Sequence, residues 1–243
     1  MSVVGVTSYF AGINVVAIDL VGTLVSKPTP HFYKAAADFL IKHGVQDSID
    51  GFRTVFRRRY WEHSMGNYET DREFYSAVVA DLSRTYDPWV EALTEIYVQS
   101  SPPFSEASQF LETMSQRYRL VLASNYVGPW AKRILESNGW LPHFHWSLVS
   151  SDCGFRKPSR QFFLELLKIS GASPSQVLMI GDSVVSDVYG ATAAGLRSVL
   201  VDRGRVSGGY GIVEHVPSVS SLHELANTLA REGVAPLRFE QGI

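Results

Sequence analysis

The chain contains little cysteine, no excess of charge of either sign and no long apolar run. Its single cysteine, Cys153, excludes an internal disulfide and a zinc site made of several thiolates. A formal net charge of −2 leaves no broad cationic field for nucleic acid or an anionic membrane. The apolar N-terminus lacks the basic residues of a signal peptide, and no run reaches the length of a membrane span. We expect a cytoplasmic protein that binds neither nucleic acid nor membrane; the sequence indicates no oligomeric state.

The spacing of apolar residues divides the chain into two kinds of segment. Residues 28–103 have apolar positions at helical spacing and no clear strand signal, and a capping box of Thr70 with Glu73 and a helix start at Asp87-Pro88 support this interpretation. From residue 104 onward, short apolar runs alternate with helical stretches, and 204–211 is expected to be a flexible connection. Such alternation predicts right-handed crossovers and a parallel sheet covered on both faces. The five runs predicted as strands are 15–18, 120–123, 147–150, 177–180 and 198–201.

Polar side chains follow three of these predicted strands. Asp19 follows the first run, Ser124 and Asn125 follow the second, and Asp182 follows the fourth. Ligands of open parallel sheets bind outside the carboxyl ends of the strands, so we expect these side chains to converge there. Asp187 lies five residues beyond Asp182 and is within reach of the same cation. Together with Lys157, which precedes a predicted helix, these groups suit Mg²⁺ and a phosphoryl group.

Four short motifs resemble those of the haloacid dehalogenase superfamily, in the branch with a helical cap inserted after the first strand. They are DLVGTL at 19–24, ASN at 123–125, RKP at 156–158 and GDSVVSD at 181–187. Each motif alone is weak, whereas all four in order around a helical insertion are specific. The resemblance covers residues 15–225 or so. It implies an α/β fold whose Rossmann-like, doubly wound parallel sheet is formed by residues 1–27 and 104–243, with a helical cap domain at 28–103.

The resemblance also implies a role for each motif residue. Asp19 would be the nucleophile that forms an aspartyl intermediate, and Lys157 would neutralise it and the developing charge. Ser124, with Asn125 beside it, would bind the transferring group. The backbone N–H groups of Gly22 and Thr23 would bind phosphate oxygens.

A magnesium ion is the cofactor that the resemblance implies. Asp19, the backbone carbonyl of Val21, Asp182 and Asp187 would hold it. The implied protein is a hydrolase, a phosphatase that acts on a small phosphorylated metabolite.

Val21 is the main departure from the family pattern, because phosphatases of the family have a second aspartate at this position. That aspartate protonates the leaving group and then activates water, and its loss costs about 10²–10⁴-fold in rate. The phosphatase would then be slow or limited to good leaving groups such as acyl phosphates. The alternatives are a haloacid dehalogenase, a phosphonatase-like hydrolase with a Schiff-base lysine in the cap, and a non-catalytic binding protein.

Asp182 favours the metal-dependent alternative. Dehalogenases of the family need no metal and lack this acid. Without a cation, carboxylates facing Asp19 would raise its pKa and weaken the nucleophile. The only lysines of the predicted cap are Lys34 and Lys42, and nothing in the sequence marks either one as desolvated.

Three successive arginines, Arg57 to Arg59, stand on a predicted helix of the cap. Successive helical residues point about 100° apart, so at most one or two of them face the site. An arginine that faces inward would bind an anionic group of the substrate.

Overall fold

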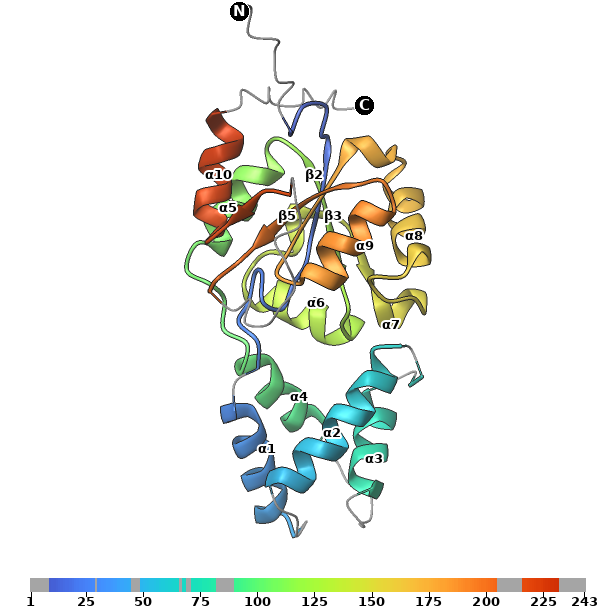
Figure 1. The fold of residues 1–243 in the computed structure, drawn as a ribbon. Helices are drawn as coiled ribbons and strands as arrows, with labels where there is room; N and C mark the ends of the chain where they lie inside the picture. The colour runs from blue at the N-terminus through green and yellow to red at the C-terminus, as the bar shows by residue number, and fades with distance from the viewer. Residues whose placement is uncertain are drawn as a thin grey trace, which may run out of the picture.

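The computed structural model describes residues 9–28, 30–44, 49–65, 67–68, 71–81, 90–204 and 216–231. Figure 1 shows a twisted sheet flanked by helices and, beyond the ends of its strands, a separate group of helices. The predicted α/β class with a doubly wound parallel sheet is confirmed. The predicted capping box at Thr70, the helix start at Asp87-Pro88 and most of 204–211 lie outside the described residues.

The sheet has six strands in the order β3-β2-β1-β4-β5-β6. All neighbouring strands are parallel. Because β1 pairs with both β2 and β4, the chain reverses its direction of winding beside β1, which is where ligands of such sheets bind. The strands are β1 (Val15–Ile18), β2 (Arg119–Ser124), β3 (Phe144–Val149), β4 (Val177–Gly181), β5 (Arg197–Val201) and β6 (Ser218–Val219).

The five predicted strands match β1 to β5, and the differences lie at the edges of the sheet. β3 begins at Phe144, three residues before its predicted start. The prediction missed these residues because exposed and half-buried positions alternate in the first half of the strand. An edge strand of this kind gives no continuous apolar run. β6 was not predicted, since two residues are too few to show a pattern.

Alternate residues of β1 pack on opposite faces of the sheet. Val16 and Ile18 belong to one apolar core with helices α5 (Ala107–Ser115), α6 (Gly128–Ser137) and α10 (Leu222–Arg231). Val15 and Ala17 belong to a second core with α8 (Arg160–Ser170) and α9 (Gly190–Ala193). All four side chains are fully buried, so β1 is held rigidly at the centre of the molecule. The short helices are η1 (Leu141–His143), α7 (Ser150–Cys153) and η2 (Pro174–Gln176).

Four helices form the separate group, which we call the cap: α1 (Pro30–Lys42), α2 (Ile49–His63), α3 (Asp71–Asp81) and α4 (Val90–Gln99). Its interior is aromatic, and it includes Trp130 of α6. The Trp130 ring lies 4.6 Å from the ring of Tyr97 and 5.4 Å from that of Phe74, between centroids. Within the ranges that the structure describes, no helix has both the length and the apolar character needed to cross a membrane.

The two linkers between sheet and cap run side by side. The Ser26 N–H donates to the Pro102 carbonyl at 2.9 Å, and the Phe104 N–H donates to the Leu24 carbonyl at 3.0 Å. Both linkers therefore leave the sheet at one place. The domain boundaries predicted at 27/28 and 103/104 fall in these linkers, and the division into two domains stays a prediction.

Candidate active site

Asp19 is the first residue after β1, and the turn that follows holds it in place. Its N–H donates to the Ile180 carbonyl at 2.9 Å, and its side chain is almost fully buried. Gly22 adopts a φ of +102°, which favours glycine. A Cβ atom at this position would lie 2.3 Å from Oδ2 of Asp182, so the turn also needs glycine for space.

Two donors meet at one oxygen of Asp19. Lys157 Nζ lies 2.8 Å from Oδ1, and the Ser124 hydroxyl donates to the same atom at 3.1 Å. Within the described part of the chain, the second oxygen, Oδ2, accepts only a long contact of 3.4 Å from the Thr23 hydroxyl. Oδ1 of Asp19 is thus held by two donors, while Oδ2 is available to bind a ligand or to attack a substrate.

Lys157 has all three of its ammonium hydrogens engaged. Besides Asp19, its Nζ atom lies 2.6 Å from Asp187 Oδ1 and 2.7 Å from the Ala123 carbonyl. Burial alone would lower the pKa of Lys157, but the carboxylates of Asp187 and Asp19 raise it above its ordinary value. This lysine is therefore a fixed positive charge.

Asn125 holds the backbone on which Lys157 is placed. Its amide donates to the Lys157 carbonyl and accepts from the Lys157 N–H, each at 2.8 Å. The sequence predicts that Asn125 binds substrate. In the structure its polar atoms bind the protein, although the residue also lines the cavity described below. These hydrogen bonds orient Lys157, and substrate binding by Asn125 stays a prediction.

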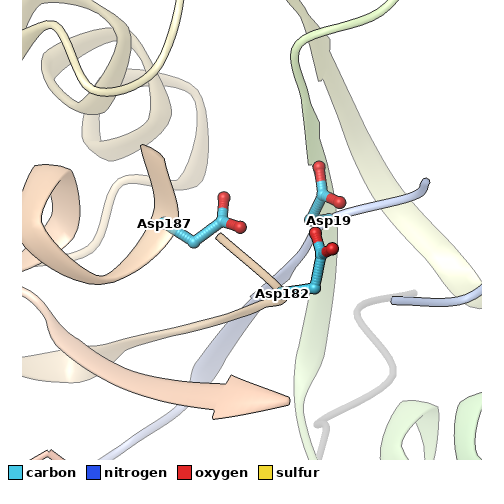
Figure 2. A group of neighbouring side chains, drawn as sticks. All are labelled: Asp19, Asp182 and Asp187. Carbon is cyan, nitrogen blue, oxygen red and sulfur yellow. The ribbon is translucent and has the colours of Figure 1, made fainter. Parts of the chain in front are cut away.

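Three carboxylates, those of Asp19, Asp182 and Asp187, converge at the carboxyl ends of β1 and β4. Each offers an oxygen, and these oxygens all lie within 4.8 Å of one another. Figure 2 shows the side chains turned toward a common point. Burial raises the pKa of Asp182, as does the Asp19 carboxylate. Such a cluster of hard oxygen donors fits a small divalent cation, which would relieve the repulsion.

Asp187 lies in a π-helical turn, η3 (Val184–Tyr189), that follows β4. Its Oδ1 binds Lys157, and its Oδ2 accepts the Ser183 N–H at 3.0 Å. Burial raises the pKa of Asp187, and the adjacent Lys157 partly offsets this. Because both oxygens already have donors, Asp187 is better placed to orient Lys157 than to bind a cation directly.

Lys27 is a member of the site that sequence reasoning missed. Its Nζ atom lies 2.6 Å from Oδ2 of Asp182, and about half of its side chain is exposed. In the sequence it is the last residue before the predicted cap, and only the path of the chain between sheet and cap brings it to the end of β4. No pattern of spacing indicates that path.

A cavity of about 520 Å³ lies above these groups, between the sheet and the cap. Asp19, Asp182 and Lys157 line one side, and Val21 lies in the same wall. The opposite side consists of aromatic and basic residues from the cap and from the loops of the sheet. These are Tyr33, Phe56, Arg57, Tyr60, Trp61, Tyr97, Tyr126 and Arg156.

Comparison with known families matches residues 13–195 to a family described as haloacid dehalogenase-like hydrolase. This segment contains all four predicted motifs and the whole cap. The predicted family resemblance is therefore confirmed.

Similarity to characterised relatives is partial. A phosphoserine phosphatase of Thermus thermophilus is 36% identical over 104 residues, which is 42% of this chain and 42% of that protein. A glyceraldehyde 3-phosphate phosphatase of Pyrococcus furiosus is 25% identical over 204 residues, 79% of this chain and 82% of that protein. The first relative is thus matched over less than half of its length, so its activity does not transfer directly.

Solved structures share the fold over nearly the whole chain. A 2-haloacid dehalogenase from Pseudomonas syringae pv. Tomato DC3000 superposes with a TM-score of 0.69 at 20% identity, covering 90% of this chain and 99% of that one. A phosphatase from Thermococcus onnurineus gives 0.65 at 22% identity, covering 93% and 100%. Both phosphatases and dehalogenases therefore have this architecture, and the fold alone does not separate them.

Proposed function

Because the chain belongs to the haloacid dehalogenase-like hydrolase family, we propose that it is a Mg²⁺-dependent phosphatase that forms an aspartyl-phosphate at Asp19. The observation that supports this most directly is the cluster of three carboxylates around the buried Lys157. A dehalogenase needs one nucleophile and no metal, so it has no use for Asp182. The substrate is a small phosphorylated metabolite, as the names of the relatives suggest.

Asp19 and Asp182 are the side chains that would hold the ion, together with the backbone carbonyl of Val21. When bound, Mg²⁺ would neutralise these carboxylates and withdraw charge from the phosphoryl oxygens. Asp187 fixes Lys157 rather than contributing a free oxygen. This donor set fits a magnesium ion, because it offers hard oxygens and leaves room for substrate oxygens and water.

Asp19 begins the reaction by attacking the phosphorus atom. A P–O bond forms at its carboxylate, the bond to the leaving oxygen breaks, and that oxygen takes the electron pair. Lys157 and the Ser124 hydroxyl stabilise the charge of the transferring group. Water then attacks the aspartyl-phosphate, releasing inorganic phosphate and restoring Asp19.

Val21 limits both steps, since valine neither donates a proton to the leaving oxygen nor removes one from water. Loss of such help lowers rates by about 10²–10⁴-fold. The enzyme is therefore slow or best suited to leaving groups that depart without a proton, such as the carboxylate of an acyl phosphate. The cytoplasmic location stays a prediction.

A phosphonatase-like mechanism is less well supported by the lysines of the chain. Lys34 and Lys42 of α1 are both exposed. Lys27 does line the cavity, but its Nζ atom is paired with the Asp182 carboxylate, whereas a Schiff base needs an amine that is available to attack a carbonyl.

A substrate panel tests the proposal. Acetyl phosphate, propyl phosphate and chloropropionate are each incubated with the wild type and with Asp19→Asn, with and without Mg²⁺. The proposal expects phosphate release from acetyl phosphate that requires both Mg²⁺ and Asp19. Halide release from chloropropionate without metal would show that the protein is a dehalogenase and not a phosphatase. No turnover of any of the three substrates would favour a non-catalytic binding protein.

A further inference from the structure

The cavity has two ends of opposite charge. At the floor, the three carboxylates of Asp19, Asp182 and Asp187 outnumber the two lysines that pair with them. At the roof, two arginines stand among aromatic rings, and no carboxylate of the described residues lines that side. The floor accounts for a phosphoryl group and a cation. The roof would face the leaving group of the substrate, and the positive charge of its two arginines is not explained by the phosphoryl group or the cation.

Arg156 is the deeper of the two roof arginines. It directly precedes Lys157 but extends in another direction, where its guanidinium lies 4.1 Å from the centre of the Trp61 ring and donates to the Ser64 hydroxyl. The side chain is half-buried, and burial lowers its pKa. No carboxylate in the part of the chain that the structure describes pairs with it. A partly buried guanidinium without a counter-ion is costly, and a ligand anion would remove that cost.

Arg57 of α2 likewise has no carboxylate partner among the described residues, whereas the other arginines of this helix do. Arg58 and Arg59 both bind Asp81, with Arg59 Nη2 lying 2.8 Å from Asp81 Oδ1. Arg53 pairs with Asp50. Of the four α2 arginines, Arg57 is the one that lines the cavity, and no carboxylate of the described residues forms an ion pair with it. Carboxylates of α2 and α3 therefore neutralise the other three arginines of α2, whereas no described carboxylate neutralises Arg57, which lines the cavity.

We propose that the substrate carries a second anionic group, a carboxylate or a phosphate, on its leaving group, and that Arg156 and Arg57 bind it. This inference rests on the proposed function, since it assumes that the first phosphoryl group sits at Asp19. A cavity of about 520 Å³ is large enough for a short chain with an anion at each end. Guanidinium groups bind both carboxylate and phosphate through paired hydrogen bonds. The two arginines therefore indicate an anionic group but do not distinguish a carboxylate from a phosphate.

Matched phosphate esters test the proposal. Propyl phosphate is the neutral reference, carboxyethyl phosphate and propanediol bisphosphate carry the second anion, and aminopropyl phosphate carries a cation. Calorimetry with the wild type in Mg²⁺-free buffer measures binding without turnover, because the proposed reaction requires the ion, and KM is measured for the wild type with Mg²⁺. We expect at least about tenfold tighter binding and lower KM for one or both dianionic esters than for propyl phosphate, because charge-assisted hydrogen bonds are strong. The better of the two identifies the anion.

Three variants assign this preference to the roof. Arg156→Met is expected to reduce the preference for dianionic esters to about threefold or less. Arg156→Lys, which keeps the charge but cannot form two parallel hydrogen bonds, should retain part of this preference. Arg57→Met should reduce it to a smaller extent. Arg58→Met is the matched control, since that arginine lies on the same helix and binds Asp81 instead. Its preference should equal that of the wild type.

The outcomes separate this inference from the proposed function. Equal binding of the neutral and dianionic esters overturns the inference, even if phosphate is released from all of them. A preference that survives in both Arg156→Met and Arg57→Met overturns it as well. Selective binding without any hydrolysis would support the anion site and count against the phosphatase.

Discussion

Lys27 Nζ lies 2.6 Å from Oδ2 of Asp182, so the linker to the cap supplies a cation to the carboxylate cluster. The Lys27 side chain is about half exposed, whereas that of Asp182 is largely buried. If Asp182 holds Mg²⁺ as proposed, the lysine and the ion would compete for the same carboxylate. The charge of Asp182 would then be balanced either by Lys27 or by an ion from solution.

Replacing Lys27 with methionine is predicted to tighten Mg²⁺ binding. Partly exposed ion pairs are worth at most about 1 kcal/mol, so the expected gain is about two- to fivefold. Calorimetric titration of Mg²⁺ into both proteins measures it. Lys34→Met, on the exposed side of α1, is the control and should bind Mg²⁺ as the wild type does. An unchanged dissociation constant in Lys27→Met would mean that the lysine and the ion do not compete.

Asp182→Asn is predicted to abolish measurable Mg²⁺ binding, because the cluster loses a charged oxygen donor. Asp187→Asn should weaken binding much less, since both oxygens of Asp187 already accept hydrogen bonds. The same titration distinguishes the two variants. If Asp187→Asn were the more damaging change, Asp187 would be a direct ligand of the ion.

Val21→Asp is predicted to raise the hydrolysis of propyl phosphate by about 10²-fold, by restoring an acid and base at the leaving oxygen. Acetyl phosphate should gain little in its first step, because its leaving group departs as a carboxylate. Steady-state assays of both substrates measure the difference, and Val21→Asn controls for polarity without proton transfer. No gain in a folded Val21→Asp protein would show that another group already donates the proton.

Asp81 of α3 is predicted to stabilise the cap through Arg59 and Arg58 of α2. Hydrogen bonds from Arg59 hold the pKa of Asp81 at about 2, below its ordinary value of 3.8. Because the pKa is lowered by folding, the stabilisation is present above about pH 4 and is lost as the pH falls toward 2. Asp81→Asn should lower the free energy of unfolding by about 1–2 kcal/mol at neutral pH.

Denaturant titrations at several pH values check this. The wild type and Asp81→Asn should converge near pH 2, while Asp38→Asn, an exposed residue of α1, should match the wild type throughout. A difference between wild type and Asp81→Asn that persisted at acid pH would assign the effect to packing and not to charge.

The central strands and the residues at their ends could be predicted from sequence, because both follow from local patterns. The run 15–18 and Asp19 after it are adjacent in the chain, and parallel pairing of β1 with β2 and β4 brings their ends together. The edges of the sheet could not be predicted as well, since the half-exposed residues of β3 show no apolar run.

Residues that reach the site from linkers or from the cap required the structure. Lys27 and Arg156 each depend on the path of a loop, which spacing does not determine. The helical turn of about 100° per residue limited the number of inward arginines on α2, but the position of Asp81 decides which two point away. Asn125 was placed at the correct strand end, yet its hydrogen bonds to Lys157 became evident only from the coordinates.

Covalent labelling shows whether Asp19 is the nucleophile that forms an aspartyl-phosphate. Since Val21 leaves the second step without a base, the aspartyl-phosphate should accumulate when wild-type protein, Mg²⁺ and acetyl phosphate are mixed and quenched in acid. Mass spectrometry of the intact protein and its peptides should then find one phosphoryl group on Asp19, and none in Asp19→Asn or without Mg²⁺. A chloropropionate-derived ester on Asp19 formed without metal, with no phosphoryl adduct under any condition, would contradict the account.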